Sequence, residues 1–367
     1  MKGVYAMAHM AGRRGSAVFA AVAAAVTLAA CGSNSSGNSS GSSGPAKLTI
    51  AVAATVGDFA PLYVAESQGY FAKNGVDLTV IPNALANTLP YLTSGRADLA
   101  MYSATIALSA AEQGKATSIV LLTERQPGFA LVGSKNTTSL SQLKSESNCR
   151  YGVPQQGTSG YGVAATLFAS LGLHCQFVIT PDPATMVAEI DSGSMNAGVL
   201  LASNADEAKS QGASILIDPR NAADRQKYFT EETPTASVFG VTANLHKKRQ
   251  GVVGFIKAMN DACVYIDSHS DAEVVADLIK ADSSFATTPT PTLIANFASS
   301  QRPYMCQGLV GPVLGDRIGY ISKSAWNTAL QTYKAFGITG FDTSAAVNSY
   351  AERVDMSYYN SAVPAKS

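Results

Sequence analysis

Residues able to hydrogen-bond a small anion gather in three short segments, 53–61, 102–105 and 155–161, each of which follows an apolar run. Hydroxyl groups, side-chain amides and the backbone amides at the start of a helix can together surround an anion and replace its water. Nearby aromatic rings can wall such a site, and an acid can select the charge of the bound molecule. The candidate ligand-binding residues are Thr55, Asp58, Phe59, Tyr102, Ser103, Thr105, Gln156, Gly157, Thr158, Ser159 and Tyr161.

The same segments have a simpler interpretation as ordinary turns between strands and helices. A hydroxyl that precedes a helix also caps its first turn. An aromatic residue such as Phe59 or Tyr63 is as suited to packing in a core as to contacting a ligand. Asp58 and Arg125 are equally suited to a solvent-exposed surface. The residue types alone leave both interpretations open.

Apolar runs alternate with amphipathic stretches from residue 46 onwards, which predicts repeated β-α-β units and a parallel sheet covered by helices. In such sheets, ligands bind beyond the carboxyl ends of the strands, where the three candidate segments are therefore expected. Strands are expected at 48–53, 76–81, 99–102, 118–123, 130–132, 151–154, 176–179, 198–201 and 237–242, and helices at 62–68, 85–94, 161–171, 183–191 and from 248–267 onwards.

The first 30 residues are typical of an export signal. Three basic residues precede an apolar run at 17–30, whose length of about 14 residues is too short to cross about 30 Å of hydrocarbon as a helix. The run ends in Leu-Ala-Ala-Cys31, which resembles the lipobox of bacterial lipoproteins. We therefore predict a signal peptide over 1–30, diacylglycerol on Cys31 and a flexible Gly/Ser-rich tether over 31–45. An ordinary secretory cleavage and an uncleaved anchor are the alternatives.

The charge of the body argues against nucleic-acid binding. The chain has 26 basic and 26 acidic residues, and the predicted signal peptide holds three of the basic ones. The remaining 23 basic and 26 acidic residues give a net charge of about −3, which offers no attraction to a polyanion. The roughly 320 residues after the tether are enough for two lobes of ordinary size.

Four cysteines remain once Cys31 is assigned to lipid, an even number that favours two disulfides in an oxidising compartment. Of the three connectivities, Cys149 with Cys175 and Cys263 with Cys306 is favoured because each pair flanks one compact helical stretch. Loops of this size predict about 3–4 kcal/mol of stability for each bond. A zinc site is the rival, but the cysteines lie far apart and the body has few histidines.

Four motifs, in order, carry a resemblance to a known family. GYFAKNGVDL at 69–78 and SGRADLA at 94–100 each lead into a predicted strand, and SLSQLK at 139–144 precedes YGVP at 151–154. AEIDSGSMNA at 188–197 is the fourth, with Asn196 where the family usually has Asp. Together they resemble the solute-binding proteins of nitrate, sulfonate and taurine ABC importers and their thiamine-pyrimidine relatives.

That resemblance implies the α/β fold of type II periplasmic binding proteins: two doubly wound lobes joined by two crossing strands, with ligand in the cleft and closure as a hinge motion. The strands at 130–132 and 237–241 are the expected crossings. Lobe one is then expected over 46–131 and 240–362, and lobe two over 132–239. The departure from Asp at Asn196 leaves any contact made by that position in doubt.

The resemblance also implies transport and not catalysis. The expected role is the extracytoplasmic solute-binding component of an ABC importer, with a permease and its ATPase as partners and with no cofactor, metal or catalytic residue. The expected ligand is a small anion such as a sulfonate, taurine or nitrate. A thiamine-pyrimidine or other heterocyclic precursor, and a sensor that presents its closed form to a receptor, are the alternatives. We expect a monomer, anchored by lipid to the outer face of the cell membrane.

Two motifs suggest enzymes but lie in unsuitable places. The stretch 160–165 fits G-x-G-x-x-A, with Asp182 about 20 residues beyond, but its glycines come late after the preceding strand. The stretch 37–41 fits G-x-S-x-G, but it lies in the tether and not in a strand-turn-helix. The body histidines, at 174, 246 and 269, fit no Ser-His-acid pattern.

Overall fold

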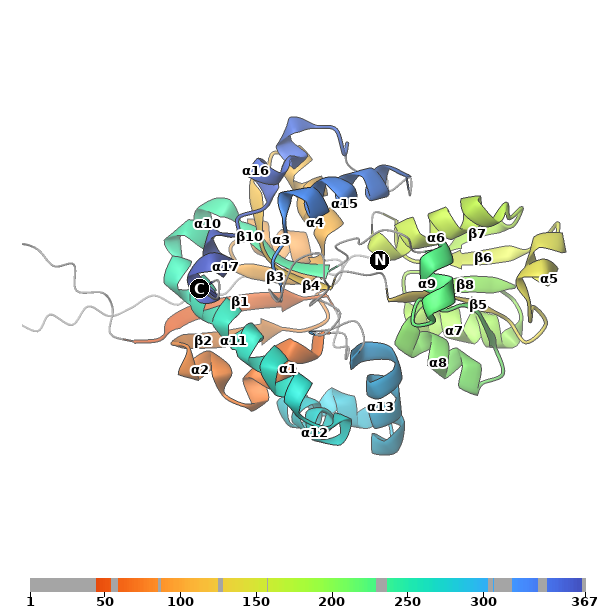
Figure 1. Cartoon of the computed structure of the whole chain (residues 1–367), viewed down its shortest axis with the longest axis horizontal. Helices are drawn as coiled ribbons and strands as arrows, with labels where there is room; N and C mark the ends of the chain where they lie inside the picture. Colours follow the sequence, from red (N-terminus) through yellow and green to blue (C-terminus); the bar gives the residue numbers. More distant parts are fainter. Residues whose placement is uncertain are drawn as a thin grey trace, which may run out of the picture. The chain divides into compact units, whose positions relative to one another are not determined.

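The computed structural model describes residues 44–53, 59–84, 87–124, 128–156, 158–228, 236–302, 306, 319–335 and 342–364. The predicted signal peptide, the lipid site at Cys31 and almost all of the tether therefore lie outside the described residues. Residues 44–367 form one compact unit. Its described part contains two five-stranded sheets, each covered by helices (Figure 1).

The first sheet, called sheet one below, has the strand order β2-β1-β3-β10-β4. β1 is parallel to β2 and β3, as the repeated β-α-β pattern predicted, whereas β10 is antiparallel to β3 and β4. The sheet is therefore mixed and not purely parallel. Its strands are β1 (Ala46–Val52), β2 (Val76–Ile81), β3 (Leu99–Ser103), β4 (Thr117–Glu124) and β10 (Ala236–Val241).

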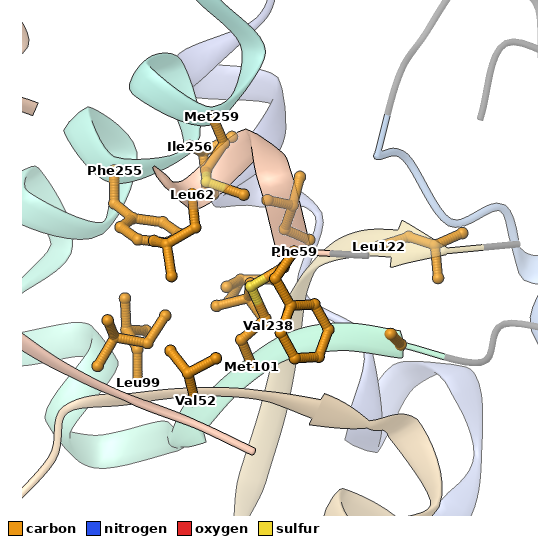
Figure 2. Close-up of a cluster of buried hydrophobic side chains, with 14 of the residues drawn as sticks. Val52, Phe59, Leu62, Leu99, Met101, Leu122, Val238, Phe255, Ile256 and Met259 are labelled. Carbon is orange, nitrogen blue, oxygen red and sulfur yellow. The ribbon is translucent and has the colours of Figure 1, made fainter. Parts of the chain in front are cut away.

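Two helices that are far apart in the sequence, α1 (Ala60–Ser67) and α11 (Arg249–Ser268), cover one face of sheet one (Figure 2). The buried residues of α11 recur at helical spacing, with Val252, Phe255 and Met259 on one stripe, so this face needs the sheet as its partner. No described helix is long and apolar enough to span a membrane.

The other elements of this lobe are α2 (Tyr70–Lys73), α3 (Thr88–Thr93), α4 (Ala104–Glu112), α10 (Thr242–Lys247), α12 (Asp271–Ala281), the turn η3 (Ser283–Thr287), α13 (Thr290–Asn296), the π-helical turn η4 (Phe297–Gln301), α15 (Lys323–Ala335), η6 (Ala346–Asn348), α16 (Tyr350–Arg353) and α17 (Ser357–Ala362).

The second sheet, sheet two, has the order β7-β6-β8-β5-β9. β6 is parallel to β7 and β8, and β5 is antiparallel to β8 and β9. Its strands are β5 (Phe129–Gly133), β6 (Arg150–Val153), β7 (Gln176–Ile179), β8 (Ala197–Leu201) and β9 (Ser214–Ile217), and its helices are α5 (Leu140–Ser145), α6 (Ser159–Leu171), α7 (Pro183–Ser192), α8 (Ala202–Ser210) and α9 (Ala222–Tyr228).

The chain passes between the sheets twice, and at other places than expected. The predicted crossing strand at 130–132 lies wholly within β5 of sheet two, and the one at 237–241 lies wholly within β10 of sheet one. The passages therefore fall between β4 and β5 and between α9 and β10. The two-sheet α/β fold class itself is confirmed.

Two disulfides join the cysteines in the connectivity favoured from the sequence. Cys149 pairs with Cys175 across the helical segment of sheet two, and Cys263 of α11 pairs with Cys306. All four side chains are buried, so the bonds belong to the packing of their lobes. Within the described residues, no group of three or more His, Cys, Asp and Glu side chains is placed to hold a metal ion.

Candidate ligand-binding site

The candidate residues of sheet one lie at one edge of that sheet. β1 and β3 are parallel and end side by side, and β10 begins at the same edge and runs the other way. Backbone pairing thereby places Ala236 opposite Ser103 and Ser237 opposite Tyr102. We call the end of the sheet that carries Tyr102, Ser103, Thr105 and Ser237 the sheet-one edge. These hydroxyl-bearing residues lie at one end of the sheet although they are far apart in sequence, with Tyr102 and Ser237 on one face and Ser103 on the other.

Ser103 and Thr105 form a buried hydroxyl pair at this edge. Their oxygens are 2.7 Å apart, and the residues are 4% and 0% exposed. Ser103 occupies the N-cap position of α4, yet its side chain makes no capping hydrogen bond. Capping, the simpler sequence interpretation, therefore does not explain Ser103. The backbone N–H groups of the first turn of α4 and its positive dipole end are directed to the same edge.

Ser237 is a residue that sequence reasoning assigned to a strand without a role. It is completely buried, and its hydroxyl has no hydrogen-bond partner among the described residues. A buried hydroxyl that lacks a partner costs about 1–3 kcal/mol of stability. Its sequence signal was a lone hydroxyl residue in the otherwise apolar run of β10.

Thr123 is a second buried hydroxyl without a partner in the described structure. It is 8% exposed and lies near the end of β4, the strand that follows β10 in sheet one. Together with Pro61 of α1 and Asn260 of α11 it lines a small, mainly apolar hollow. The sequence placed Thr123 only as the last residue of a strand.

Tyr102 carries the phenol of the sheet-one edge. Its side chain is partly buried, and burial raises the pKa of Tyr102 to about 12. The phenol therefore stays protonated at physiological pH and can donate a hydrogen bond, while its ring offers an apolar surface. Both properties suit the role that the sequence predicted for it.

Phe59 and Tyr63 belong to the core of the sheet-one lobe. Phe59 is 8% exposed and lies among Leu62, Met101 and Val238 in the cluster of Figure 2. The ring of Tyr63 meets Phe285 edge-on at 5.1 Å between centroids. Packing, the alternative left open by the sequence, accounts for the burial of both rings.

The third candidate segment leads from β6 into α6 of sheet two. Thr158 donates to the carbonyl of Gln155 at 2.6 Å and accepts from the backbone N–H of Tyr161 at 3.3 Å, so this hydroxyl does cap its helix. Tyr161 packs edge-on against Phe177 at 6.3 Å. Gln156 is exposed, and Ser159 begins α6. Three other residues discussed from the sequence, Thr55, Asp58 and Arg125, lie outside the described residues, and so does Gly157.

Asn196 has a structural explanation at the position where the resemblance led us to expect Asp. Its side-chain oxygen accepts from the backbone N–H of Arg150 at 2.8 Å, and its amide donates to the Glu146 carboxylate at 2.6 Å. An aspartate could accept the first hydrogen bond but not donate the second. The amide therefore ties β8 to the segment between α5 and β6, at the end of sheet two where β6 begins.

Two residues of the dinucleotide-like motif have local structural roles. Gly160 lies in the first turn of α6, where an added Cβ would come within 2.8 Å of the Phe129 ring. Asp182, the acid of the motif, caps α7 by accepting from the backbone N–H of Thr185 at 2.9 Å and from its hydroxyl at 2.6 Å. Both residues therefore serve local packing and capping.

An ion cluster joins segments that belong to the two sheets. Arg220, which follows β9, donates to Asp206 of α8 at 2.7 and 2.9 Å and to Asp218 at 2.7–3.1 Å. The hydroxyl of Ser299 in η4 donates to Asp206 at 3.0 Å, and the Ser299 carbonyl accepts from Arg220 at 3.4 Å. No sequence motif indicated this contact, because its four residues span more than 90 positions.

Solved structures share this fold. A protein of Bordetella bronchiseptica RB50 matches with a TM-score of 0.69 and 22% identity, over 86% of this chain and 96% of that one. The periplasmic nitrate-binding protein NrtA from Synechocystis PCC 6803 matches with 0.66 and 16%, over 87% and 88%. The periplasmic aliphatic sulphonate-binding protein SsuA from Escherichia coli matches with 0.62 and 16%, over 80% and 87%. At such identities these likenesses establish the fold, that of periplasmic binding proteins.

Sequence comparison identifies the family. Among curated proteins, none matches this chain. The sequence profile described as NMT1/THI5 like matches residues 56–273, which is more than half of the chain and includes the sheet-one edge, sheet two and all of α11. The chain belongs to the NMT1/THI5-like family.

Proposed function

We propose that this protein is the extracytoplasmic solute-binding component of an ABC importer and that it captures a small anion such as a sulfonate, taurine or nitrate. The observation that carries the proposal is the set of buried, neutral hydroxyls at the sheet-one edge, of which Ser237 has no partner in the described structure. The binding-protein fold and the family support the general role. The two neighbours named for nitrate and sulphonate suggest the ligand class.

The sheet-one edge suits an anion because its donors are neutral and already dehydrated. Sulfonate, nitrate and carboxylate oxygens accept hydrogen bonds, which the Ser237 hydroxyl, the hydroxyl pair of Ser103 and Thr105 and the first amides of α4 can supply. Hydrogen bonds to a charged ligand are stronger than neutral ones, at about 1.5–3 kcal/mol each. No bond of the ligand is made or broken in this role.

The full proposal includes lipid anchorage at Cys31 and delivery to a membrane permease. It rests on the Leu-Ala-Ala-Cys31 sequence at the end of an apolar run and on the Gly/Ser-rich segment that follows. A lipid-held body can hand its ligand to a permease in the same membrane without diffusing away. The partner is expected to recognise the closed form that the ligand stabilises.

A heterocyclic ligand such as a thiamine-pyrimidine precursor is the second candidate. The partly buried ring of Tyr102 at the sheet-one edge favours it, because a flat ring can stack there while the phenol donates a hydrogen bond. A sensor that presents its closed form to a receptor would use the same edge. Neighbouring permease and ATPase genes would favour import, and a lone receptor kinase gene would favour sensing.

The experiment is a thermal unfolding series on residues 44–367, the compact unit that contains both sheets. Alkyl and aryl sulfonates, nitrate, bicarbonate, pyrimidine precursors, riboflavin and amino acids are added separately. A ligand at 100 times its dissociation constant should stabilise the folded state by about 2.7 kcal/mol. A shift confined to anions supports the proposal, a shift confined to pyrimidines selects the alternative, and no shift with any of these compounds contradicts both.

A further inference from the structure

A basic hollow lies on the sheet-one lobe, at the end of the sheet opposite the candidate ligand site. It measures about 430 Å³ and is lined mainly by the polar residues Lys73, Asn74, Arg249, Gln250, Lys257 and Ser361. Three of these six side chains carry a positive charge and none carries a negative one. We call this feature the basic hollow. None of its residues belongs to the sheet-one edge.

Two glycines of α11 bring the walls of the basic hollow together. A Cβ at Gly251 would come within 2.9 Å of the Ala46 Cβ, and a Cβ at Gly254 within 2.5 Å of the Asn74 carbonyl oxygen. The first turn of α11 can therefore lie directly on the start of β1 and on the turn between α2 and β2. This close approach sets Arg249 and Lys257 of α11 beside Lys73 of α2.

Two of the three positive charges of the basic hollow, those of Arg249 and Lys257, have no acidic partner among the described residues. Lys257 is exposed and has no partner among the described residues. Arg249 donates to neutral oxygens of Ser357 and Ser361 at 3.1–3.2 Å and lies over the ring of Tyr358, 4.5 Å from its centroid. Lys73 is 70% exposed and forms a long ion pair with Asp261, at 3.9 Å. A net positive site therefore exists on a body whose overall charge is about −3.

The basic hollow lies close to the residue at which the predicted tether joins the body. Ala46, against which α11 packs, is the first residue of β1, and its N–H donates to the Gly75 carbonyl at 2.8 Å. Cys31 lies 15 positions earlier, and 15 residues span at most about 50 Å even when fully extended. If Cys31 carries lipid, as the proposed function states, the basic hollow starts where the membrane tether ends.

We propose that the basic hollow binds the phosphate of an anionic phospholipid headgroup. The ammonium groups of Lys73 and Lys257 supply the charge, and the first turn of α11 adds its positive dipole end. β1 runs from the hollow to the sheet-one edge, a distance of about 20 Å for its seven residues. Headgroup binding would thus hold this end of sheet one at the bilayer surface, while the residues of the sheet-one edge stay clear of the headgroups.

The test uses residues 44–367 without lipid, in a sedimentation assay with phosphatidylcholine vesicles that contain or lack phosphatidylglycerol. Each basic side chain near an anionic surface contributes about 1 kcal/mol, or roughly five-fold in partition. The double variant Lys73→Gln/Lys257→Gln should therefore reduce binding to phosphatidylglycerol vesicles roughly 25-fold. The control Lys144→Gln/Lys209→Gln removes the same charge from exposed positions of the sheet-two lobe and should leave binding unchanged.

The outcomes separate the possible explanations. Enrichment on phosphatidylglycerol that is lost in the first variant, kept in the control and weakened by salt supports the proposal. Equal loss in both double variants would overturn it, because net charge alone would then explain binding. Equal binding to both vesicle types, or stabilisation by inorganic phosphate without vesicle binding, would overturn it as well. Ligand-induced stabilisation of the same variants reports separately on the proposed solute-binding function.

Discussion

Ser237→Ala should raise the stability of the ligand-free protein and weaken its binding of ligand. The Ser237 hydroxyl is completely buried and has no partner in the described structure, so it weakens the ligand-free fold. The substitution removes one buried polar atom and leaves the strand and its pairing with Tyr102 intact. We therefore expect the ligand-free variant to be at least as stable as the parent, which is unusual for a change in a core.

The expected gain follows from the cost of an unpaired hydroxyl. That cost is about 1–3 kcal/mol, and loss of one atom's packing offsets part of it, so a net gain of about 1 kcal/mol is reasonable. In a chain of this size it corresponds to an increase of about 2 °C in Tm. Thermal unfolding of residues 44–367 without ligand measures it.

The expected loss is in affinity. A hydrogen bond to a charged ligand contributes about 1.5–3 kcal/mol, so Kd should rise by roughly 10-fold to 150-fold, measured by titration calorimetry with the anion that stabilises the parent. Ser118→Ala is the matched control, because this hydroxyl of the adjacent strand β4 is paired with Thr242 at 2.9 Å. The control should lower stability by about 1 kcal/mol and leave Kd unchanged.

A fall in ligand-free stability together with an unchanged Kd would contradict both expectations for Ser237→Ala. It would mean that the Ser237 hydroxyl has a partner within the protein and no part in binding. A rise in Kd for the Ser118 control of the same size would show that any change in this sheet perturbs the site. The two variants together therefore test the placement of the site at the sheet-one edge.

Three further changes have expected outcomes. Asn196→Asp should lower the free energy of unfolding by about 1–2 kcal/mol near neutral pH, because two carboxylates, the one introduced at position 196 and that of Glu146, would then face each other. Urea unfolding should show that this loss is recovered as the pH falls into the range where carboxylates are protonated. Arg220→Gln should cost about 2–3 kcal/mol in the same assay, because two largely shielded carboxylates lose their shared partner, whereas a Lys209→Gln control should change little. Reduction of the two disulfides, whose cysteines are 26 and 43 positions apart, should lower stability by about 3–4 kcal/mol each, as seen by unfolding with and without reductant; no change would indicate that the bonds do not constrain the unfolded chain.

The sequence predicted the elements of the fold where local pattern decides them. β1, β2 and β3 follow from apolar alternation between helical stretches, and the structure has them at nearly the expected residues. The antiparallel direction of β10 could not be predicted, because nothing in its own apolar run records which way the chain returns to sheet one. The four-residue strand β9 and the helix α8 before it were not predicted, although Gly212 marks the turn between them with a φ of 105°.

Only part of the candidate site could be predicted, because local sequence does not show which tertiary contacts a hydroxyl makes. Ser103 and Thr158 look alike in sequence, since each hydroxyl residue precedes a helix, yet only Thr158 caps its helix in the structure. The difference arises from tertiary contacts, which place Thr105 within hydrogen-bond distance of Ser103. Ser237 was invisible as a candidate because its significance lies in the absence of a partner, which only a structure can reveal.

Native mass spectrometry of residues 44–367 with the stabilising solute measures whether the chain binds that solute intact and through Ser237. We expect one solute per chain, released on denaturation with its mass unchanged and bound more weakly by Ser237→Ala. Recovery of a chemically altered solute would contradict the proposed role, because a binding protein makes and breaks no bond. Equal occupancy of the parent and the variant would contradict the placement of the site at the sheet-one edge.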